Sequence, residues 1–265
     1  MNLELQDRCA VITGAASGIG RALALHAAQL GMKLALADVD AAGLAKVAAE
    51  VNALGATVAS TTLDVRRREQ LDAFAADTFE QLGPVALVFA NAGVMRAGTS
   101  WQLAAADWEQ VIDVNYKGAA HTAGVFVPYL LQQGQPAQLV FTGSTSSFLP
   151  RPHLSAYSSS KHALWGLAEA LQLELAELGA PVGVSLLAPA GVRTALADPG
   201  SETNEAQRNL RQVLEAFGTP AEEIARLTFE AVRERRFWIL PHPQFKDALL
   251  ERAATVAEER LPRPG

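Results

Sequence analysis

Short apolar runs alternate with longer segments of helical periodicity along almost the whole chain. Each run is apolar at successive positions and bounded by turn residues, which is typical of strands covered on both faces in a parallel sheet. The runs predict strands over Cys9–Thr13, Lys33–Ala37, Thr57–Leu63, Val85–Ala90, Gln138–Thr142, Val182–Leu187 and Phe237–Leu240. Between them, the periodicity predicts helices over Ile19–Leu30, Ala41–Leu54, Glu69–Leu82, Ala105–Leu131, Ala156–Leu178 and Ala221–Glu234.

This alternation predicts an α/β fold, a doubly wound parallel sheet of about seven strands with helices on both faces. No linker divides the chain, so we expect residues 1–265 to form a single domain. Two segments interrupt the rhythm: 195–217, a candidate lid that contains a polar loop at Asp198–Gln207, and 241–265, a C-terminal extension with a helix over Phe245–Glu259. Side chains expected to cap helices are those of Asp40, Asp107 and Ser155.

Composition and charge narrow the class of protein. The chain is 49% hydrophobic and 19% charged, as expected of a globular protein. A formal net charge of -6 with no basic stripe argues against a nucleic-acid partner. No run approaches the ~20 apolar residues of a membrane-spanning helix, and Met1–Arg8 lacks the apolar core of a signal peptide. The single cysteine, Cys9, excludes an internal disulfide, and we expect a cytoplasmic protein without a membrane partner.

A glycine-rich turn follows the first strand, in Thr13-Gly14-Ala15-Ala16-Ser17-Gly18-Ile19-Gly20. Glycines here let the backbone approach a pyrophosphate, and the N-terminus of the next helix offers N–H groups and a favourable dipole to the anion. The next strand ends at Asp38, whose carboxylate can accept hydrogen bonds from ribose hydroxyls and would repel a 2′-phosphate. Neither Ser17 nor Val39 adds a compensating positive charge, so the sequence favours NAD(H) over NADP(H).

Tyr157 and Lys161 stand at i and i+4 near the start of a predicted helix, and so on one helical face. An ammonium beside a phenol favours the phenolate and lowers the tyrosine pKa. A tyrosine tuned in this way can exchange a proton with an alcohol or ketone oxygen. On its own, however, a pair at this spacing is more often a surface contact.

Further motifs stand in a fixed order along the chain, and with them the sequence resembles the short-chain dehydrogenase/reductase family over nearly its whole length. The matching motifs are the glycine loop Thr13–Gly20, Asp64-Val65 after the third strand, Asn91-Ala92-Gly93 after the fourth, Asn115, Ser144, the pair Tyr157 and Lys161, and Pro189–Thr194 after the sixth. The resemblance implies a Rossmann-type, dinucleotide-binding catalytic domain.

The resemblance also assigns roles by position. It implies that Tyr157 is the acid/base, that Lys161 lowers its pKa and holds the nicotinamide ribose, and that Ser144 binds the reacting oxygen. It implies that Asn115 helps to fix a water near Lys161. The positions implied to contact the cofactor are Gly14, Ser17, Gly18, Ile19, Gly20, Asp38, Asp64, Val65, Asn91, Ala92, Gly93, Tyr157, Lys161, Pro189, Gly191, Val192 and Thr194.

One position departs from the family pattern. Where the family usually has Pro-Gly after the sixth strand, this chain has Pro189-Ala190-Gly191. A methyl group at Ala190 is expected to shift the nicotinamide-side loop or to narrow the approach of substrate.

The expected reaction is hydride transfer between NAD(H) and a secondary alcohol or ketone. Candidate walls of the substrate pocket are mostly apolar and comprise Met95, Arg96, Thr145, Phe148, Leu149, His153, Ala195 and Leu196. No cluster of cations suited to a carboxylate or phosphate stands out in the sequence. We therefore expect a neutral, hydrophobic substrate, with bulky and aromatic compounds included.

Alternative functions are an epimerase or dehydratase on the same scaffold, an enoyl reductase, and a non-catalytic NAD-sensing protein. Epimerases and dehydratases usually carry a larger C-terminal substrate region, and enoyl reductases space tyrosine and lysine more widely. A sensor has no chemical need for the complete set Asn115, Ser144, Tyr157 and Lys161. The histidines show no paired metal-ligand spacing, so no metal site is expected. The family resemblance implies a homodimer or homotetramer joined by the helices Ala105–Leu131 and Ala156–Leu178.

Overall fold

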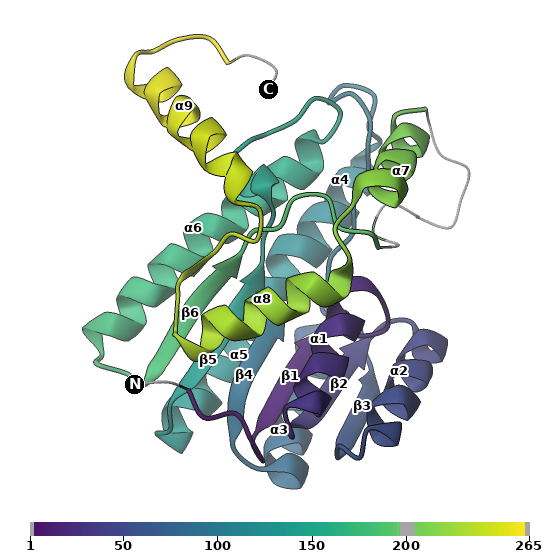
Figure 1. Ribbon diagram of the computed structural model, residues 1–265, viewed down its shortest axis with the longest axis vertical. Coiled ribbons are helices and arrows are strands. Elements are labelled where there is room, and N and C mark those ends of the chain that lie inside the picture. The colour runs from purple at the N-terminus through teal and green to yellow at the C-terminus, as the bar shows by residue number, and fades with distance from the viewer. Residues whose placement is uncertain (1–2, 195, 197–204, 263–265) are drawn as a thin grey trace.

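The computed structural model describes residues 3–194, 196 and 205–262. Within them, parallel strands form one seven-stranded sheet in the order β3-β2-β1-β4-β5-β6-β7 (Figure 1). The strands are β1 (Cys9–Thr13), β2 (Lys33–Asp38), β3 (Val58–Thr62), β4 (Val85–Ala90), β5 (Ala137–Thr142), β6 (Val182–Leu187) and β7 (Trp238–Ile239). The predicted doubly wound, Rossmann-type parallel sheet is confirmed.

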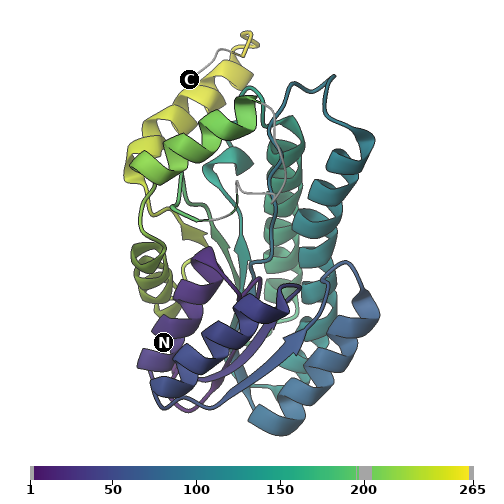
Figure 2. The same cartoon turned by 90° about the vertical axis from the view of Figure 1, so that its right-hand side faces the viewer.

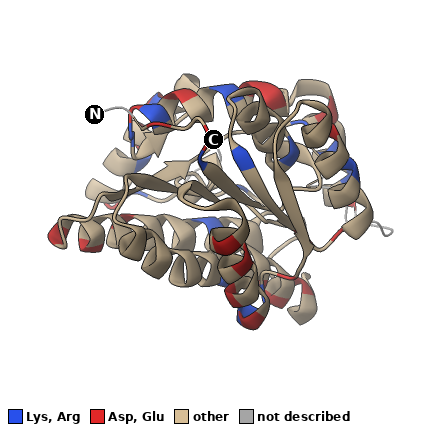
Figure 3. Cartoon of the chain, turned by 90° about the horizontal axis from the view of Figure 1, so that it is seen from below, with Lys and Arg blue, Asp and Glu red and all other residues tan. Residues whose placement is uncertain are grey.

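Helices cover both faces of this sheet (Figure 2). They are α1 (Gly18–Gln29), α2 (Ala41–Ala53), α3 (Arg68–Leu82), α4 (Ala105–Ile112), α5 (Gly118–Gln133), α6 (Ser155–Glu177), α7 (Glu205–Phe217), α8 (Ala221–Arg233) and α9 (Lys246–Ala257). Buried side chains of α1, α2 and α8 form a core on one face, and those of α3, α5 and α6 form a second core on the other. The charged residues lie mostly on the outer helices (Figure 3).

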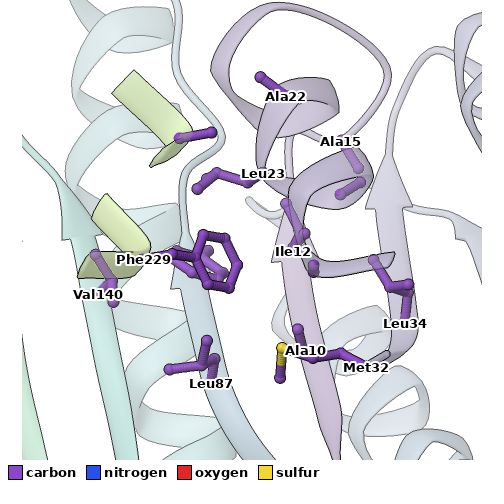
Figure 4. Packing of buried hydrophobic residues seen from close by; sticks show 14 of the residues in the cluster. Ala10, Ile12, Ala15, Ala22, Leu23, Met32, Leu34, Leu87, Val140 and Phe229 are labelled. Atoms are coloured by element: carbon purple, nitrogen blue, oxygen red, sulfur yellow. The ribbon is translucent and has the colours of Figure 1, made fainter. Parts of the chain in front are cut away.

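The central strands β1, β4, β5 and β6 are mostly apolar because both of their faces are buried, whereas the edge strand β3 is only partly buried and carries polar residues. In β1, Ile12 belongs to the first core and its neighbour Val11 to the second, as the alternation of side chains along a strand requires. Phe229 of α8 is 1% exposed and closes the first core. Its ring lies among Ile12, Leu23 and Leu87 (Figure 4). The two cores fix the sheet as a rigid platform for the residues at its carboxyl edge.

The long predicted helix Ala105–Leu131 is interrupted. α4 ends at Ile112, a π-helical turn spans Asp113–Lys117, and α5 continues from Gly118. The apolar periodicity runs through this turn, and for that reason the sequence pattern does not reveal it. Asn115 lies within the turn and is buried.

Of the three expected caps, Asp40 is confirmed, since its carboxylate accepts hydrogen bonds from the backbone N–H groups of Ala42 and Gly43. Asp107 is not a cap: α4 begins earlier, and Asp107 lies in its first turn, where a carboxylate favours the helix dipole instead. Ser155 is the first residue of α6 and makes no cap either.

The predicted loop Asp198–Gln207 falls largely outside the described residues, since 197–204 are not described. Its last part, Glu205–Gln207, is not a loop but the first turn of α7. In the C-terminal extension 241–265, a short turn over Pro243–Phe245 leads into α9. α7 and α9 both stand at the upper end of the molecule, beyond the carboxyl edge of the sheet (Figure 1).

Candidate active site

A cavity of about 840 Å³ opens at the carboxyl ends of the strands. Its lining comes from the segments that follow β1, β2, β3, β4, β5 and β6, together with α7 and the C-terminal extension. β1 and β4 lie side by side in the sheet although two strands separate them in sequence order, and such a switch of strand order is where doubly wound folds bind ligands. The cavity is large enough for a cofactor-sized ligand.

The glycine turn after β1 leaves no room for a side chain at Gly14 or Gly20. A Cβ at Gly14 would lie 2.7 Å from Cα of Ala92, and one at Gly20 would collide with the carbonyl oxygen of Gly14. Gly14 and Gly18 also have φ of 67° and 52°, in the left-handed region that favours glycine. Ser17, at the N-cap of α1, makes no side-chain cap, so the first N–H groups of the helix have no such partner. The turn therefore offers a cradle for an anion.

Asp38 ends β2 beside this turn and lines the cavity. Its carboxylate accepts hydrogen bonds from the backbone N–H of Ala16, at 2.9 Å, and from that of Asp40, also at 2.9 Å. These bonds fix the carboxylate and leave further lone pairs for a ligand. Asp64 and Val65 line the cavity after β3. Hydrogen bonds from the guanidinium and the backbone N–H of Arg66 hold the pKa of the Asp64 carboxyl below its ordinary value.

A chain of hydrogen bonds joins the glycine turn to Lys161. Asn91 donates from Nδ2 to the carbonyl oxygens of Thr13 (3.0 Å) and Gly14 (3.3 Å), and its Oδ1 accepts from Oγ1 of Thr142 at 3.1 Å. Nζ of Lys161 in turn donates to the carbonyl oxygen of Thr142 at 2.6 Å. The ends of β1, β4 and β5 and the start of α6 are thereby held in one arrangement.

Ser144, Tyr157 and Lys161 meet in the cavity, and all three are buried. Tyr157 and Lys161 share one face of α6, with Nζ of Lys161 5.6 Å from the centroid of the tyrosine ring. Ser144 comes from the segment after β5, and a side-chain hydrogen bond links it to Tyr157. The arrangement brings a phenol, a hydroxyl and an ammonium to one place.

Burial dominates the ionisation of this group. It raises the pKa of Tyr157 to about 12, although the hydrogen bond with Ser144 acts in the opposite direction. It lowers the pKa of Lys161 to about 8. The tyrosine pKa is thus raised where Lys161 was expected to lower it, because burial removes the phenol from water. In this state Tyr157 holds its proton and is a donor.

Asn115 does not line the cavity, but it holds segments that do. Its Oδ1 accepts from the N–H of Val94 at 2.8 Å, and its Nδ2 donates to the carbonyl oxygen of Val94 (2.9 Å) and to Oγ of Ser160 (3.0 Å). Ser160 in turn donates to the carbonyl oxygen of Tyr157 at 2.7 Å. The side chain thus fixes the loop after β4 against the first turns of α6.

Most of the remaining predicted cofactor positions also line the cavity: Ile19, Ala92, Gly93, Pro189, Gly191, Val192 and Thr194. Gly20 was predicted with them but is not part of the lining. Of the predicted substrate positions, Met95, Arg96, Thr145 and Leu196 line it too, whereas Leu149 does not and packs against the second core. Phe148 does not; its ring packs against Trp165 and Trp238, with centroids 4.9 and 5.8 Å away. His153 is exposed outside the lining, and Ala195 is not among the described residues.

A family model described as short chain dehydrogenase matches residues 8–205. The match includes the glycine turn and all of the cavity residues that precede α7. The chain belongs to the short-chain dehydrogenase/reductase family. It is accordingly an oxidoreductase, and its cavity is the candidate active site of that enzyme class.

Named relatives cover most of this short-chain dehydrogenase. The 1-deoxy-11-beta-hydroxypentalenate dehydrogenase of Streptomyces exfoliatus is 36% identical over 239 residues, 89% of this chain and 84% of its own. A short-chain dehydrogenase/reductase from Burkholderia phymatum, solved in complex with NAD, is 39% identical with a TM-score of 0.95, over 99% of this chain and 98% of its own. An alcohol dehydrogenase from Thermococcus sibiricus, complexed with 5-hydroxy-NADP, is 28% identical with a TM-score of 0.76, over 88% and 95%.

Sequence reasoning missed His242, which lines the active-site cavity of this short-chain dehydrogenase from the C-terminal extension. Its Nδ1 accepts from the N–H of Ala190 at 3.0 Å, so the ring proton is on Nε2, which lies 2.8 Å from Oγ1 of Thr219. His242 thereby ties the loop after β6 to the segment before α8. Its only sequence signal is a histidine beyond the last strand, and nothing local indicates its partner Ala190.

Two further findings bear on the class of site. Among the described residues, no group of three or more histidine, cysteine or acidic side chains is placed to hold a metal ion. In the same part of the chain, no helix combines the length and the apolar character needed to cross a membrane.

The buried ammonium of Lys161 predicts a pH dependence of stability in the cofactor-free protein. Its folded pKa of about 8 lies below the ordinary 10.5, so between these values the unfolded chain binds more protons than the folded one. The stability of wild type relative to Lys161→Met therefore rises as pH increases through this interval. Urea unfolding of both proteins at both ends of the interval measures this difference. Tyr157 is present in both, and a difference that stays constant or falls would contradict the burial of a charged lysine.

Proposed function

We propose that this chain is an NAD(H)-dependent dehydrogenase that interconverts secondary alcohols and ketones, with Tyr157 as its acid/base. The observation that carries the proposal is one cavity lined by both the glycine turn and the group Ser144, Tyr157 and Lys161. An anion cradle beside a buried proton donor suits a dinucleotide at one end and a reacting oxygen at the other.

The residues present fit a dinucleotide. The N–H groups at the start of α1 and the glycine turn would hold its pyrophosphate. Asp38 would hold the adenosine ribose, with Asp64 and Val65 near the adenine and Asn91, Ala92 and Gly93 behind it. Pro189, Gly191, Val192 and Thr194 would enclose the nicotinamide end, with Lys161 on its ribose. When bound, the nicotinamide supplies or accepts the hydride.

Charge supports NAD(H) over NADP(H). The carboxylate of Asp38 would repel a 2′-phosphate. One candidate for a compensating cation is Arg66, which also lines the cavity, but its guanidinium is bound by Asp64 at 2.6 Å. NADP(H) would therefore have to displace an existing ion pair.

In the direction of ketone reduction, Tyr157 gives its proton to the substrate oxygen as negative charge develops there. Ser144 donates a hydrogen bond to the same oxygen and stabilises that charge. Lys161 favours the phenolate that remains, and its Nζ is held for this by the carbonyl oxygen of Thr142. In alcohol oxidation the same proton returns to Tyr157. Asn115 contributes by positioning the loop after β4 and the start of α6. The proposal also includes a water held near Asn115 and Lys161.

The reacting carbon would meet an apolar, uncharged wall, since Met95, Val114, Leu154 and Leu196 line the cavity. This favours a hydrophobic substrate that is neutral at its reacting end, bulky and aromatic compounds included. The proposal includes a cytoplasmic location and a homodimer or homotetramer joined by α5 and α6. Exposed apolar side chains support the assembly, since Leu173 of α6 and Leu178 directly after it are each 70% exposed.

Removing one hydroxyl tests the proposed acid/base. Tyr157→Phe is expected to lower kcat at least about 100-fold while NADH binding and the unfolding midpoint stay close to wild type. Tyr129→Phe is the matched control, because Tyr129 stacks on Phe79 and does not line the cavity. Turnover by Tyr157→Phe within a few-fold of wild type would refute the assigned role.

Asp38 sets the expected cofactor preference. In Asp38→Ala, the ratio of kcat/KM for NADH to that for NADPH should fall about tenfold or more, because the repulsion of the 2′-phosphate is lost. Asp40→Ala serves as the control: it removes a helix cap, at a cost of about 1 kcal/mol in stability, but leaves the ratio unchanged. An unchanged ratio in Asp38→Ala would show that another residue discriminates.

His242 is expected to position the nicotinamide-side loop through Ala190. His242→Asn keeps an acceptor where Nδ1 stands, whereas His242→Gln keeps a polar group only near Thr219. NADH affinity, measured by calorimetric titration, should fall roughly fivefold to tenfold in His242→Gln, where the N–H of Ala190 loses its partner. His242→Asn should bind close to wild type. Equal affinities in the two variants would contradict this role.

A further inference from the structure

α7 presents an apolar stripe to the active-site cavity. Leu210, Val213, Leu214 and Phe217 stand at i, i+3, i+4 and i+7, and all four line the cavity. Val213 is 53% exposed and Phe217 is 85% exposed. Large apolar side chains that line a cavity and are still open to water mark a surface for an apolar ligand.

Arg151 lines the same cavity from the segment between β5 and α6. Its guanidinium lies over the ring of Phe245, 5.9 Å from the ring centroid. Stacking on an aromatic ring uses the face of the guanidinium and leaves its N–H edge available for a carboxylate. The stack also holds the side chain in place, so less conformational freedom is lost when the edge binds a ligand.

Among the described residues, the guanidinium of Arg151 has no acidic partner and donates no hydrogen bond. The other two arginines of the cavity lining differ in this respect. Arg96 is bound by Asp107 at 3.3 Å and by Gln110 at 2.7 Å, and Arg66 is bound by Asp64. Among the described residues, Arg151 is thus the arginine of this lining whose guanidinium is not held by a carboxylate.

The acids of the cavity lie elsewhere. Of the described lining residues, the carboxylates are Asp38 and Asp64, both beside the glycine turn, where the adenosine end of a dinucleotide would lie. The opposite end, between α7 and Phe245, contains Arg151 without a carboxylate of the described lining to balance it. Arg151 is exposed, so water screens its charge, but a guanidinium without a carboxylate partner still attracts an anion.

We propose that the substrate is an amphipathic alcohol or ketone whose apolar body lies against α7 and whose carboxylate, remote from the reacting carbon, binds the N–H edge of Arg151. This rests on the proposed dehydrogenase function and defines its substrate class. It also revises the sequence-based expectation of a fully neutral substrate. That expectation rested on the absence of a cation cluster in the sequence. One arginine that the fold brings to the cavity is sufficient for one carboxylate.

The test compares three eight-carbon probes of equal length and different charge: octanoate, octanol and octylammonium. Each is titrated calorimetrically into the protein with NADH present. Octanoate is expected to bind roughly fivefold more tightly than octanol, and octylammonium more weakly than both. Added salt should reduce the preference for octanoate, since the contribution is electrostatic. Because none of the probes needs to react, the result is independent of turnover.

Three variants separate the two parts of the proposed site. Arg151→Gln should bind octanoate and octanol equally, and Arg151→Lys should keep part of the preference. Phe217→Ser should weaken all three probes by a similar factor. Arg236→Gln removes the same charge from an exposed arginine outside the cavity lining and should behave as wild type.

Equal binding of octanoate and octanol by the wild type, or a preference that survives in Arg151→Gln, would overturn the proposal. So would failure of every probe to bind. None of these outcomes affects the dehydrogenase assignment, which is tested separately by turnover of neutral ketones in wild type and Tyr157→Phe.

Discussion

The hydrogen bonds of Asn91 hold together the place where the whole site is assembled. Its amide nitrogen binds the glycine turn after β1, and its amide oxygen binds Thr142 at the end of β5. Thr13 adds to this, because its Oγ1 accepts from the backbone N–H groups of Asn91 and Ala92. The turn for the phosphates and the carbonyl that holds Lys161 are therefore parts of one network at the switch in strand order. The network thus couples the position of the glycine turn to that of Lys161.

Burial changes the ionisation of the two titratable side chains at this site. The same packing that fixes Tyr157 and Lys161 removes them from water, which raises the pKa of the phenol and lowers that of the ammonium. Both shifts favour neutral side chains in the ligand-free protein. Tyr157 thus favours its protonated form beside Ser144, which is the form that the proposed reduction of a ketone requires.

Much of the fold could be predicted from the sequence because local signals and tertiary structure agree there. Strands buried on both faces are continuously apolar, and glycines such as Gly14 are required by backbone contacts too close for a side chain. The order of the motifs sufficed for the family. The helix break at Asp113–Lys117 was not predictable, since the apolar periodicity continues through it. The expected polar loop Asp198–Gln207 extends too far at its end, because Glu205–Gln207 form the first turn of α7.

The substrate end was the least predictable part, because its residues are distant in sequence. Phe148 follows Ser144 closely and is apolar, yet it faces the aromatic cluster with Trp165 rather than the cavity. Arg151 gains its setting only when the C-terminal extension brings Phe245 beneath it. His242 likewise finds its partner only in the fold, where it accepts a hydrogen bond from Ala190 in the loop after β6. Such contacts arise from the fold and leave no periodic pattern in the sequence.

The central claim is that one cavity brings a nicotinamide and a ketone together for direct hydride transfer. The most direct measurement uses NADH that carries deuterium at both positions of nicotinamide C4, with a panel of hydrophobic ketones, and mass analysis of the alcohol formed. The account predicts one deuterium on the carbinol carbon of each product. NADH that is neither bound nor oxidised with any ketone, or an alcohol that lacks the label, would contradict it.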